Sequence, residues 1–396
     1  MFDDAEIARL RADTPGTQRV LHFNNAGAGL MPRQVLDAIK DHLDLEAETG
    51  GYEAAGMRQA ELQRPYDAIA AYLNCAREEV AVVENATVAW NQAFFAVLDG
   101  MKPGERILTA EAEYVSNFLS YLKAAKERGV RIEVVPSDPD GVLDVKALRE
   151  MIDERVRLIA VTHVPTNGGL VNPAEEIGAV AREAGVTYLL DACQSAGQMP
   201  LDVERIGCDF LTATGRKYLR GPRGTGFLYA SRAAMEKYDP PVIDLHAAQW
   251  MTVDAYRWRS DAGRFENWES YQAGKIGLGV AVDLMLQVGA GRIEARVEEL
   301  AATLRRRLAE VDGVEVHDLG RKRCGIVTFT HSAMPAQSAR SALRAEKMNV
   351  SVSGPSSTLV DMTKRGLPDL VRASVHYYNT FEEVDRFVEA VDRLGR

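Results

Sequence analysis

Short apolar runs alternate with amphipathic stretches from about residue 80 to residue 230. The apolar runs predict strands at Val80–Val83, Arg106–Thr109, Val130–Val135, Leu158–Thr162, Val186–Leu190, Phe210–Ala213 and Phe227–Tyr229. Between them, apolar residues recur at helical spacing, which predicts helices at Val88–Leu98, Val115–Arg128, Val145–Glu154 and Ala174–Ala184. This alternation predicts an α/β fold with a mainly parallel, seven-stranded sheet and helices on both faces.

A different pattern begins near residue 286. We predict a small α+β unit there, with a long charged helix at Gly291–Val311, strands at Val314–His317, Gly325–Thr330 and Val371–Val375, and helices at Ala336–Glu346 and Phe381–Leu394. The expected division is therefore a large domain over residues 21–285 and a small C-terminal domain over residues 286–396. Residues 1–20 should pack near the small domain. No low-complexity linker separates the two domains, so we expect an extensive interface between them.

Composition and charge narrow the class of protein. A chain of 396 residues is expected to form two domains rather than one core. A formal net charge of −10 argues against a nucleic-acid surface, which needs clustered lysine and arginine. The first residues lack the basic and apolar regions of a signal peptide, and no apolar stretch reaches the ~20 residues of a membrane helix. We expect a soluble, cytoplasmic protein that binds neither membrane nor nucleic acid.

The cysteines and histidines give no sign of a disulfide framework or a metal site. The four cysteines are scattered along the chain and contain no C-x-x-C pair, which is typical of a reducing compartment. The seven histidines show no metal-ligand spacing with one another or with the cysteines. We therefore expect neither a structural nor a catalytic metal.

Residues capable of chemistry follow two neighbouring predicted strands. Asp191 ends one apolar run and Gln194 comes three residues later, while the next run is followed by Thr214-Gly-Arg-Lys217. A lysine can form a Schiff base with the aldehyde of pyridoxal 5′-phosphate, and an acid can keep its pyridine nitrogen protonated. A hydroxyl and the guanidinium of Arg216 can take the phosphate. The pattern predicts a pyridoxal-phosphate enzyme that acts on an amino acid.

Ordinary explanations exist for these residues. A lysine in a glycine-rich loop is usually solvated, and Asp191 can cap the following helix. The chemical interpretation is favoured because an unpaired buried carboxylate is costly and a bound pyridinium would supply its partner. Further candidates follow other strands or lie in the small domain: Ala86 and Thr87 as an anion site at a helix start, Tyr114 as a ring-stacking residue, Thr166 and Asn167 as polar groups at the same edge, and Arg372 as a carboxylate clamp.

Several motifs occur in the order found in one enzyme family. They are Leu189-Leu-Asp-Ala-Cys-Gln194, Thr214-Gly-Arg-Lys217, Arg264-Phe-Glu266 and Arg372-Ala-Ser followed by Tyr378-Asn-Thr380. From about Leu21 to Phe387 the chain resembles the class V aminotransferase family of fold-type I pyridoxal-phosphate enzymes. That family includes cysteine desulfurases, selenocysteine lyases and isopenicillin N epimerase-like proteins. The resemblance implies the large-plus-small-domain fold and a homodimer with active sites at the interface.

The resemblance also implies a role for each candidate residue. Lys217 would hold the cofactor, Asp191 would bind the pyridine nitrogen, and Gln194 would bind the phenolic oxygen. The phosphate would be bound by the Ala86 amide, Thr87, Thr214 and Arg216, and the ring would be stacked by Tyr114 and flanked by Thr166 or Asn167. Arg372 would bind the substrate carboxylate, and Asn25 would line the pocket. The segment after Arg264-Phe-Glu266 would reach the phosphate of the neighbouring subunit.

Departures from the family pattern bear on the reaction. Desulfurases carry a nucleophilic cysteine ahead of the carboxylate-binding arginine, whereas residues 350–358 contain no cysteine. A persulfide cannot form on serine, so a sulfur-relay desulfurase is disfavoured. Asn267-Trp-Glu-Ser270 replaces the usual small residues, which leaves the contact with a neighbouring phosphate open.

Three reactions remain compatible with the motifs. The sequence favours an aminotransferase-type reaction, with a C–S lyase or an epimerase as the alternatives, and it does not specify the substrate side chain. A nucleotide-binding dehydrogenase is disfavoured because no G-x-G-x-x-G follows an early strand. The retained Lys217, Asp191 and Arg372 argue against a non-catalytic scaffold.

Overall fold

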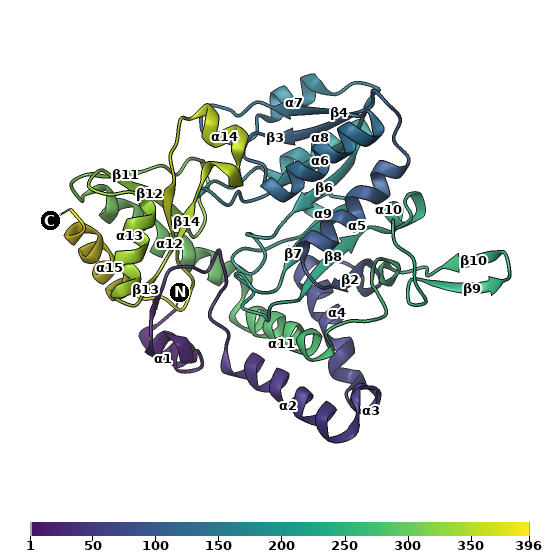
Figure 1. Cartoon of the computed structure of the whole chain (residues 1–396), viewed down its shortest axis with the longest axis horizontal. Coiled ribbons are helices and arrows are strands. Elements are labelled where there is room, and N and C mark those ends of the chain that lie inside the picture. Colours follow the sequence, from purple (N-terminus) through teal and green to yellow (C-terminus); the bar gives the residue numbers. More distant parts are fainter. Residues whose placement is uncertain (1, 396) are drawn as a thin grey trace.

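The computed structural model describes residues 2–395, and a sheet of seven strands lies at the centre of its larger part (Figure 1). The strands are β2 (Val80–Val83), β3 (Arg106–Ala110), β4 (Arg131–Val135), β5 (Val156–Thr162), β6 (Thr187–Asp191), β7 (Phe210–Thr214) and β8 (Gly226–Ala230). Their spatial order is β2-β8-β7-β6-β5-β3-β4, and only β8 runs antiparallel to its neighbours. The predicted fold class is confirmed, and the predicted strand bounds differ from these by two residues at most.

Helices cover both faces of this sheet. The covering helices include α5 (Ala86–Asp99) and α6 (Val115–Arg128) on one face and α8 (Ala174–Ala184) on the other. Adjacent residues of a strand point to opposite faces. Leu189 accordingly packs in one core with Phe94, and Leu190 packs in the other core with Ile177. Burial on both faces explains why the strands read as continuous apolar runs.

Other helices lie around this core. They are α1 (Asp4–Ala12), α2 (Arg33–Thr49), α3 (Gly51–Met57), α4 (Gln59–Leu73), α7 (Val145–Met151), α9 (Val203–Ile206), α10 (Arg232–Lys237) and α11 (Gln272–Val288). Helix α7 ends three residues before its predicted end. Ile152 is already extended, and the Asp153 carboxylate accepts a hydrogen bond from the Arg155 amide, which closes a turn.

The C-terminal part is built on a second sheet of four antiparallel strands in the order β11-β12-β15-β14. Its elements are β11 (Val314–Val316), β12 (Ile326–His331), β14 (Ser351–Ser353), β15 (Leu370–Ser374), α12 (Ala290–Ala309), α13 (Ala336–Ala345), α14 (Leu359–Lys364) and α15 (Phe381–Arg393). Arg11 of α1 forms a 2.9 Å ion pair with Glu383 of α15. The boundaries at residues 20 and 285 stay predictions.

Two short strand pairs were not predicted. β1 (Leu21–His22) pairs in parallel with β13 (Met348–Asn349), which ties the start of the large domain to the small one. β9 (Ala248–Thr252) and β10 (Ala255–Trp258) form a hairpin that projects away from the body (Figure 1). Most side chains of this hairpin are exposed, so no alternation of buried and exposed positions marks it in the sequence.

No single helix within residues 2–395 is long and apolar enough to cross a membrane. The bent pair α11 and α12 meets the test of length and composition only when its two helices are taken together across a 78° bend.

Gly197 allows the loop after β6 to approach the turn that carries Lys217. Gly197 has a φ of +93°, and its amide donates a 3.0 Å hydrogen bond to the Tyr72 hydroxyl. A Cβ atom on Gly197 would lie 2.3 Å from the carbonyl carbon of Tyr218 and 2.4 Å from the nitrogen of Leu219. Both atoms belong to the backbone that follows Lys217. Only glycine therefore allows the loop after β6 to pack on the turn after β7.

Replacing Gly197 should destabilise the protein more than replacing a glycine whose Cβ position is in open space. Gly197→Ala should lower the free energy of unfolding by more than about 2 kcal/mol, because a left-handed backbone penalty adds to a clash with backbone atoms. Gly185→Ala is the matched control: Gly185 also has positive φ (+65°), but nothing lies within 4 Å of its Cβ position. The control should lose about 1 kcal/mol. Urea unfolding measures both, and equal losses would contradict the packing described.

Candidate active site

The predicted site residues meet at one edge of the large sheet. The parallel strands β3, β5, β6 and β7 have their carboxyl ends at this edge, and Thr162 pairs with Asp191 there. Lys217 lies in the turn that follows β7. Burial lowers the pKa of its ammonium group; Asp191 opposes that shift, and Arg216 and Arg372 add to it. Asp191, Arg216 and Arg372 therefore lie within electrostatic range of Lys217, and burial shifts this group toward its neutral form.

Asp191 and Gln194 are both buried beside this turn. Asp191 is 5% exposed and accepts hydrogen bonds from the Cys193 amide at 2.8 Å and from Asn117 Nδ2 at 2.9 Å. Gln194 donates from Nε2 to the Ala26 carbonyl at 3.2 Å, and its buried Oε1 has no partner within residues 2–395. A buried amide oxygen without a partner is rare, which indicates that another polar group belongs in this space.

The start of α5 offers an anion site. The Asn85 side chain caps the helix by accepting from the Val88 amide at 3.1 Å. Ala86 and Thr87 form the first turn, and their amides have no protein acceptor in the described chain. A Cβ on Gly226 would lie 2.8 Å from the backbone of Asn85, so this glycine lets β8 approach the helix start. Free amides at a helix N-terminus suit a phosphate group.

Thr214 and Arg216 are also near this edge, but both are engaged within the protein. The Thr214 hydroxyl donates to the Thr225 carbonyl at 3.3 Å. Arg216 donates from its guanidinium to the Gly27 carbonyl, and burial lowers its pKa. The phosphate-binding roles of Thr214 and Arg216 stay predictions.

Arg372 is a buried guanidinium with neutral partners. It lies on β15, is 8% exposed, and donates to Ser351 Oγ at 3.0 Å and to Thr166 Oγ1 at 2.6 Å. No carboxylate of residues 2–395 lies within ion-pair distance of it, and burial lowers its pKa to about 10. A buried cation without an anion is costly. Arg372 is therefore suited to bind a substrate carboxylate in a bidentate geometry.

Thr166 and Asn167 do different things in the structure. Thr166 lies against Arg372, whereas Asn167 donates from Nδ2 to the Gly354 carbonyl at 3.0 Å and contacts the sulfur of Met362 at 2.7 Å. Asn167 therefore ties the large domain to the segment between β14 and α14. The expectation that either residue binds the cofactor stays a prediction.

Asn25 anchors the loop that covers the Lys217 turn. Its Nδ2 donates to the Ser374 carbonyl at 2.8 Å, and its Oδ1 accepts from the Tyr378 hydroxyl at 2.5 Å. In the same loop, the Gly29 amide donates to the Arg216 carbonyl at 2.8 Å, and a Cβ on Gly29 would lie 2.6 Å from the Lys217 carbonyl oxygen. Asn25 thus holds this loop in place, and its role in lining a substrate pocket stays a prediction.

Tyr114 begins α6, and two polar residues around it were missed in the sequence. Its amide donates to the buried carboxyl group of Glu113 at 2.9 Å, and Asn117 on the next turn contacts both Glu113 and Asp191. The sequence signal for them was the spacing of Glu113 and Asn117, a carboxylate and an amide four residues apart, which lie on the same side of a helix start. The expectation that Tyr114 stacks on the cofactor ring stays a prediction.

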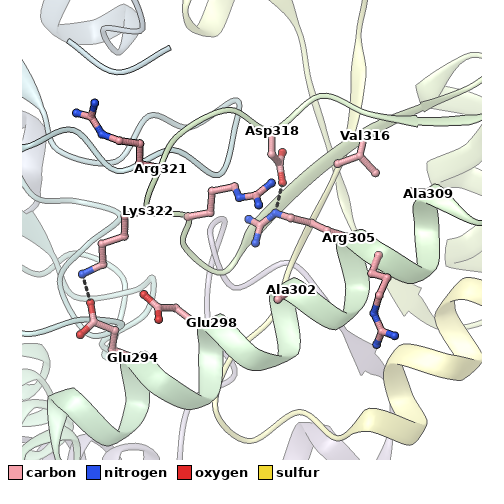
Figure 2. A pocket seen from close by; sticks show the side chains of 11 residues that line it. Glu294, Glu298, Ala302, Arg305, Ala309, Val316, Asp318, Arg321 and Lys322 are labelled. Carbon is pink, nitrogen blue, oxygen red and sulfur yellow. Dashed lines mark hydrogen bonds and ion pairs between the residues drawn. The ribbon is translucent and has the colours of Figure 1, made fainter. Parts of the chain in front are cut away.

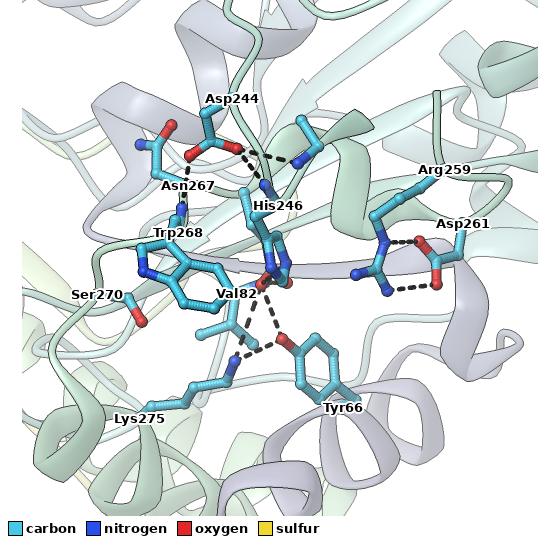
Figure 3. Close-up of polar contacts among 12 residues, drawn as sticks. Tyr66, Val82, Asp244, His246, Arg259, Asp261, Asn267, Trp268, Ser270 and Lys275 are labelled. Atoms are coloured by element: carbon cyan, nitrogen blue, oxygen red, sulfur yellow. Dashed lines mark hydrogen bonds and ion pairs between the residues drawn. The ribbon is translucent and has the colours of Figure 1, made fainter. Parts of the chain in front are cut away.

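Glu266 of the Arg264-Phe-Glu266 motif belongs to a buried polar cluster with Tyr66, His246 and Lys275, whose side chains converge in Figure 3. Glu266 is 5% exposed and accepts from the Val82 amide at 2.7 Å and from the Tyr66 hydroxyl at 2.8 Å, with His246 3.4 Å away. The contact with Val82 occupies an amide of the edge strand β2 and so blocks that edge. The adjoining Trp268 is half exposed, and its amide donates to Asp244 at 2.6 Å.

A hollow of about 850 Å³ lies along α12, and its lining contains none of the predicted site residues (Figure 2). Four of the eight charged side chains that line it form two ion pairs with one another. Arg305 forms a 2.6 Å ion pair with Asp318, and Lys322 pairs with Glu294. Within residues 2–395, no group of three or more His, Cys, Asp or Glu side chains is arranged to hold a metal ion. The edge that carries Lys217 therefore remains the candidate active site.

The residues at this edge fit pyridoxal 5′-phosphate. A desolvated amine, a buried acid and free helix amides supply partners for the aldehyde, the pyridine nitrogen and the phosphate. The donation from Gln194 to the phenolic oxygen stays a prediction, because its amide nitrogen is engaged with Ala26 and the unpartnered atom is the oxygen. The cofactor would supply the electron sink that stabilises negative charge at the substrate Cα.

Comparisons with known proteins find relatives over nearly the whole chain. A probable cysteine desulfurase of Methanothermobacter thermautotrophicus is 30% identical over 395 residues, which cover 98% of this chain and 97% of the relative. A probable cysteine desulfurase of Xylella fastidiosa is 31% identical over 402 residues, covering 98% and 95%. The apo structure of a cysteine desulfurase from Thermococcus onnurineus is 28% identical, with a TM-score of 0.91 over 98% of this chain and 97% of that one.

The match to a family model has the same extent as the resemblance seen in the motifs. The model for class V aminotransferases matches residues 21–387. Fold, motifs and relatives thus agree over nearly the whole chain. The chain belongs to the class V aminotransferase family and is a pyridoxal-phosphate-dependent enzyme of the fold-type I group.

Proposed function

We propose that this enzyme is a C–S lyase that breaks the Cβ–S bond of a cysteine-derived S-conjugate by β-elimination. The observation that carries the proposal is the combination of desulfurase relatives with a serine-containing strand at β14. Ser351 of β14 accepts a hydrogen bond from Arg372, and residues 350–358 contain no cysteine. The relatives are named for cysteine as substrate. Elimination is consistent with a substrate that has a Cβ–S bond and with a site that has no protein thiol to receive the sulfur.

The four cysteines of the chain support this proposal. Burial raises the pKa of the thiols of Cys193 and Cys208 well above the usual range, that of Cys324 to about 11, and that of Cys75 to about 12. A thiolate is the form that attacks sulfur, and such thiols carry very little of it at neutral pH. Cys193 is the one on which Lys217 acts electrostatically, and it follows Asp191 at the bottom of the site.

The chain's own residues can carry out the elimination. Arg372 binds the substrate carboxylate and orients the Cα–H bond toward Lys217, whose neutral amine takes the proton. The electron pair of that bond forms the Cα–Cβ double bond, and the Cβ–S pair leaves with the sulfur. Asp191 keeps the ring nitrogen of the bound cofactor protonated. Burial favours the neutral amine that the proton transfer needs.

Transamination is the second candidate, and the sequence pattern favoured it. It shares the removal of the Cα proton by Lys217 and differs in where a proton is returned. A lyase needs no amino acceptor, whereas an aminotransferase stops after one turnover unless a keto acid is supplied. Epimerisation would return the proton to Cα and release no keto acid.

The deciding assay measures keto-acid release from a panel of cysteine S-conjugates and ordinary amino acids. We expect continuous release of pyruvate and ammonia from an S-conjugate without added keto acid, and loss of this activity in Lys217→Ala by at least about 10²-fold, the range of a general base. Stoichiometric conversion that continues only with a keto acid would establish transamination instead. Sulfur transfer to a protein thiol, detected as a persulfide on Cys75, Cys193, Cys208 or Cys324, would contradict the lyase.

Arg372 should govern substrate binding. Arg372→Gln should raise KM for the amino-acid substrate by about 10- to 100-fold, because a charged hydrogen bond to the carboxylate contributes about 1.5–3 kcal/mol. Arg305→Gln is the control for loss of a buried arginine: Arg305 is 8% exposed and pairs with Asp318 away from Lys217. It should lower stability and leave KM unchanged. A similar KM in Arg372→Gln and wild type would rule out the carboxylate clamp.

We also propose that the enzyme is a homodimer. The β9–β10 hairpin projects from the body (Figure 1), with Trp250 78% exposed and Tyr256 57% exposed. Trp268 and Tyr271, which follow it in the chain, are also exposed. An isolated two-stranded hairpin is marginally stable in water. Large exposed aromatic side chains are typical of an interface core. A second copy of this chain is the partner that the family resemblance implies.

Charges placed on the hairpin should separate the subunits. Trp250→Glu combined with Tyr256→Glu should shift the sedimentation coefficient from that of a dimer to that of a monomer, because charge is disfavoured in a desolvated interface. Glu53→Lys, on the exposed part of α3, is a control that also changes surface charge. A wild type that sediments as a monomer of 43.5 kDa would refute the homodimer.

A further inference from the structure

Glu113 is a buried carboxyl group beside the candidate site that the proposed chemistry does not use. It lies between β3 and α6 and is 1% exposed. No cation of residues 2–395 is among the groups that shift its pKa. Burying a carboxyl group without a cation is costly, and stability alone would be served as well by an apolar residue. Its contacts indicate another role.

Five hydrogen bonds converge on the two oxygens of Glu113. The donors lie on three elements and a turn: Thr109 Oγ1 at 3.0 Å, the Tyr114 amide at 2.9 Å, Asn117 Nδ2 at 2.9 Å, the Thr162 amide at 3.0 Å and the Thr162 hydroxyl. They hold the carboxyl group in one orientation at the carboxyl ends of β3 and β5. A fully satisfied buried polar network of this kind is rigid and places its members accurately.

Asn117 connects Glu113 to the acid of the site. The same Nδ2 that donates to Glu113 Oε1 also donates to Asp191 Oδ2 at 2.9 Å. An amide nitrogen carries two hydrogens, so it can link two carboxyl groups at once. The other oxygen of Asp191 accepts from the Cys193 amide. Asp191 is thereby held from two sides.

We propose that Glu113 is a positioning residue for the cofactor ring. Through Asn117 it orients Asp191 toward the pyridine nitrogen, and through the Tyr114 amide it places the Tyr114 side chain at the ring face. This inference rests on the proposed pyridoxal-phosphate chemistry, because it assigns Glu113 a role only with the ring bound. Glu113 itself touches neither cofactor nor substrate.

The charge of Glu113 is coupled to the same site. Burial raises its pKa to about 7; hydrogen bonds from Thr162 and Asn117 oppose this shift, and the charge of Asp191 adds to it. The other titratable group coupled to it is Tyr121 on α6, while Asp191 acts on Lys217. Above about pH 7 an ionised Glu113 adds negative potential behind Asp191. That potential strengthens the hold of Asp191 on a protonated ring nitrogen.

The test uses the visible absorption of protein loaded with pyridoxal 5′-phosphate, followed as a function of pH. Glu113→Gln should move the midpoint of the spectral transition to lower pH by about half a unit or more, because a negative charge near the ring is lost. It should also weaken pyridoxal 5′-phosphate binding by about tenfold, the equivalent of about 1.4 kcal/mol. Equilibrium dialysis measures the binding.

Tyr121→Phe is the matched control. Tyr121 is buried on α6 and donates to the Ala160 carbonyl at 3.3 Å, with no hydrogen bond to Asp191. The variant should lose thermal stability and keep the wild-type midpoint and affinity. Equal midpoints and affinities in wild type and Glu113→Gln would overturn the positioning role while leaving the proposed function intact. A wild type with no visible band after loading would refute the proposed function and this inference with it.

A second measurement needs no variant, should Glu113→Gln fail to fold. Infrared difference spectra of wild type with ¹³C-labelled glutamate, before and after loading with pyridoxal 5′-phosphate near pH 7, report on protonated glutamate. Loading places a positive ring nitrogen on the far side of Asp191 and should reduce the labelled carboxylic-acid signal. An unchanged labelled signal would overturn the coupling.

Discussion

The burial of one amine sets the requirements for the rest of the site. Lys217 follows a fully buried strand, and its desolvation lowers the pKa of its ammonium group. A neutral amine in this position is reactive toward an aldehyde and can accept a proton from Cα. The same burial makes neighbouring charges expensive, and hydrogen bonds from the protein hold both Asp191 and Arg372.

The parallel sheet explains why distant residues meet. Its carboxyl ends place Tyr114, Thr166, Asp191 and Lys217 at one edge, and strand bounds read from apolar runs were accurate to two residues. This part was predictable because most strands are buried along their length, and β5, β6 and β7 end on the polar residues Thr162, Asp191 and Thr214. The β9–β10 hairpin was not, since its large side chains are exposed in the single chain. The direction of a side chain such as Asn167, which contacts Met362, depends on tertiary contacts that spacing does not encode.

Residues of the small domain bear on which reaction follows the shared removal of the Cα proton. Arg372 on β15 is fixed by Ser351 on the neighbouring strand and by Thr166 of the large domain. This clamp joins the two domains across the pocket. Residues 350–358 contain no cysteine, and the four thiols present are poor nucleophiles at neutral pH because burial raises their pKa values. Glu113 completes the opposite wall by supporting Asp191 through Asn117.

Covalent attachment of the cofactor to Lys217 is the central claim, and peptide mapping tests it directly. Purified protein is loaded with pyridoxal 5′-phosphate, reduced with sodium borohydride, digested and examined by mass spectrometry. The account predicts that the reduced cofactor is found on the peptide that contains Thr214-Gly-Arg-Lys217, and that Lys217→Ala gives no labelled peptide. Stoichiometric labelling of another lysine such as Lys275, or retained labelling in Lys217→Ala, would contradict it.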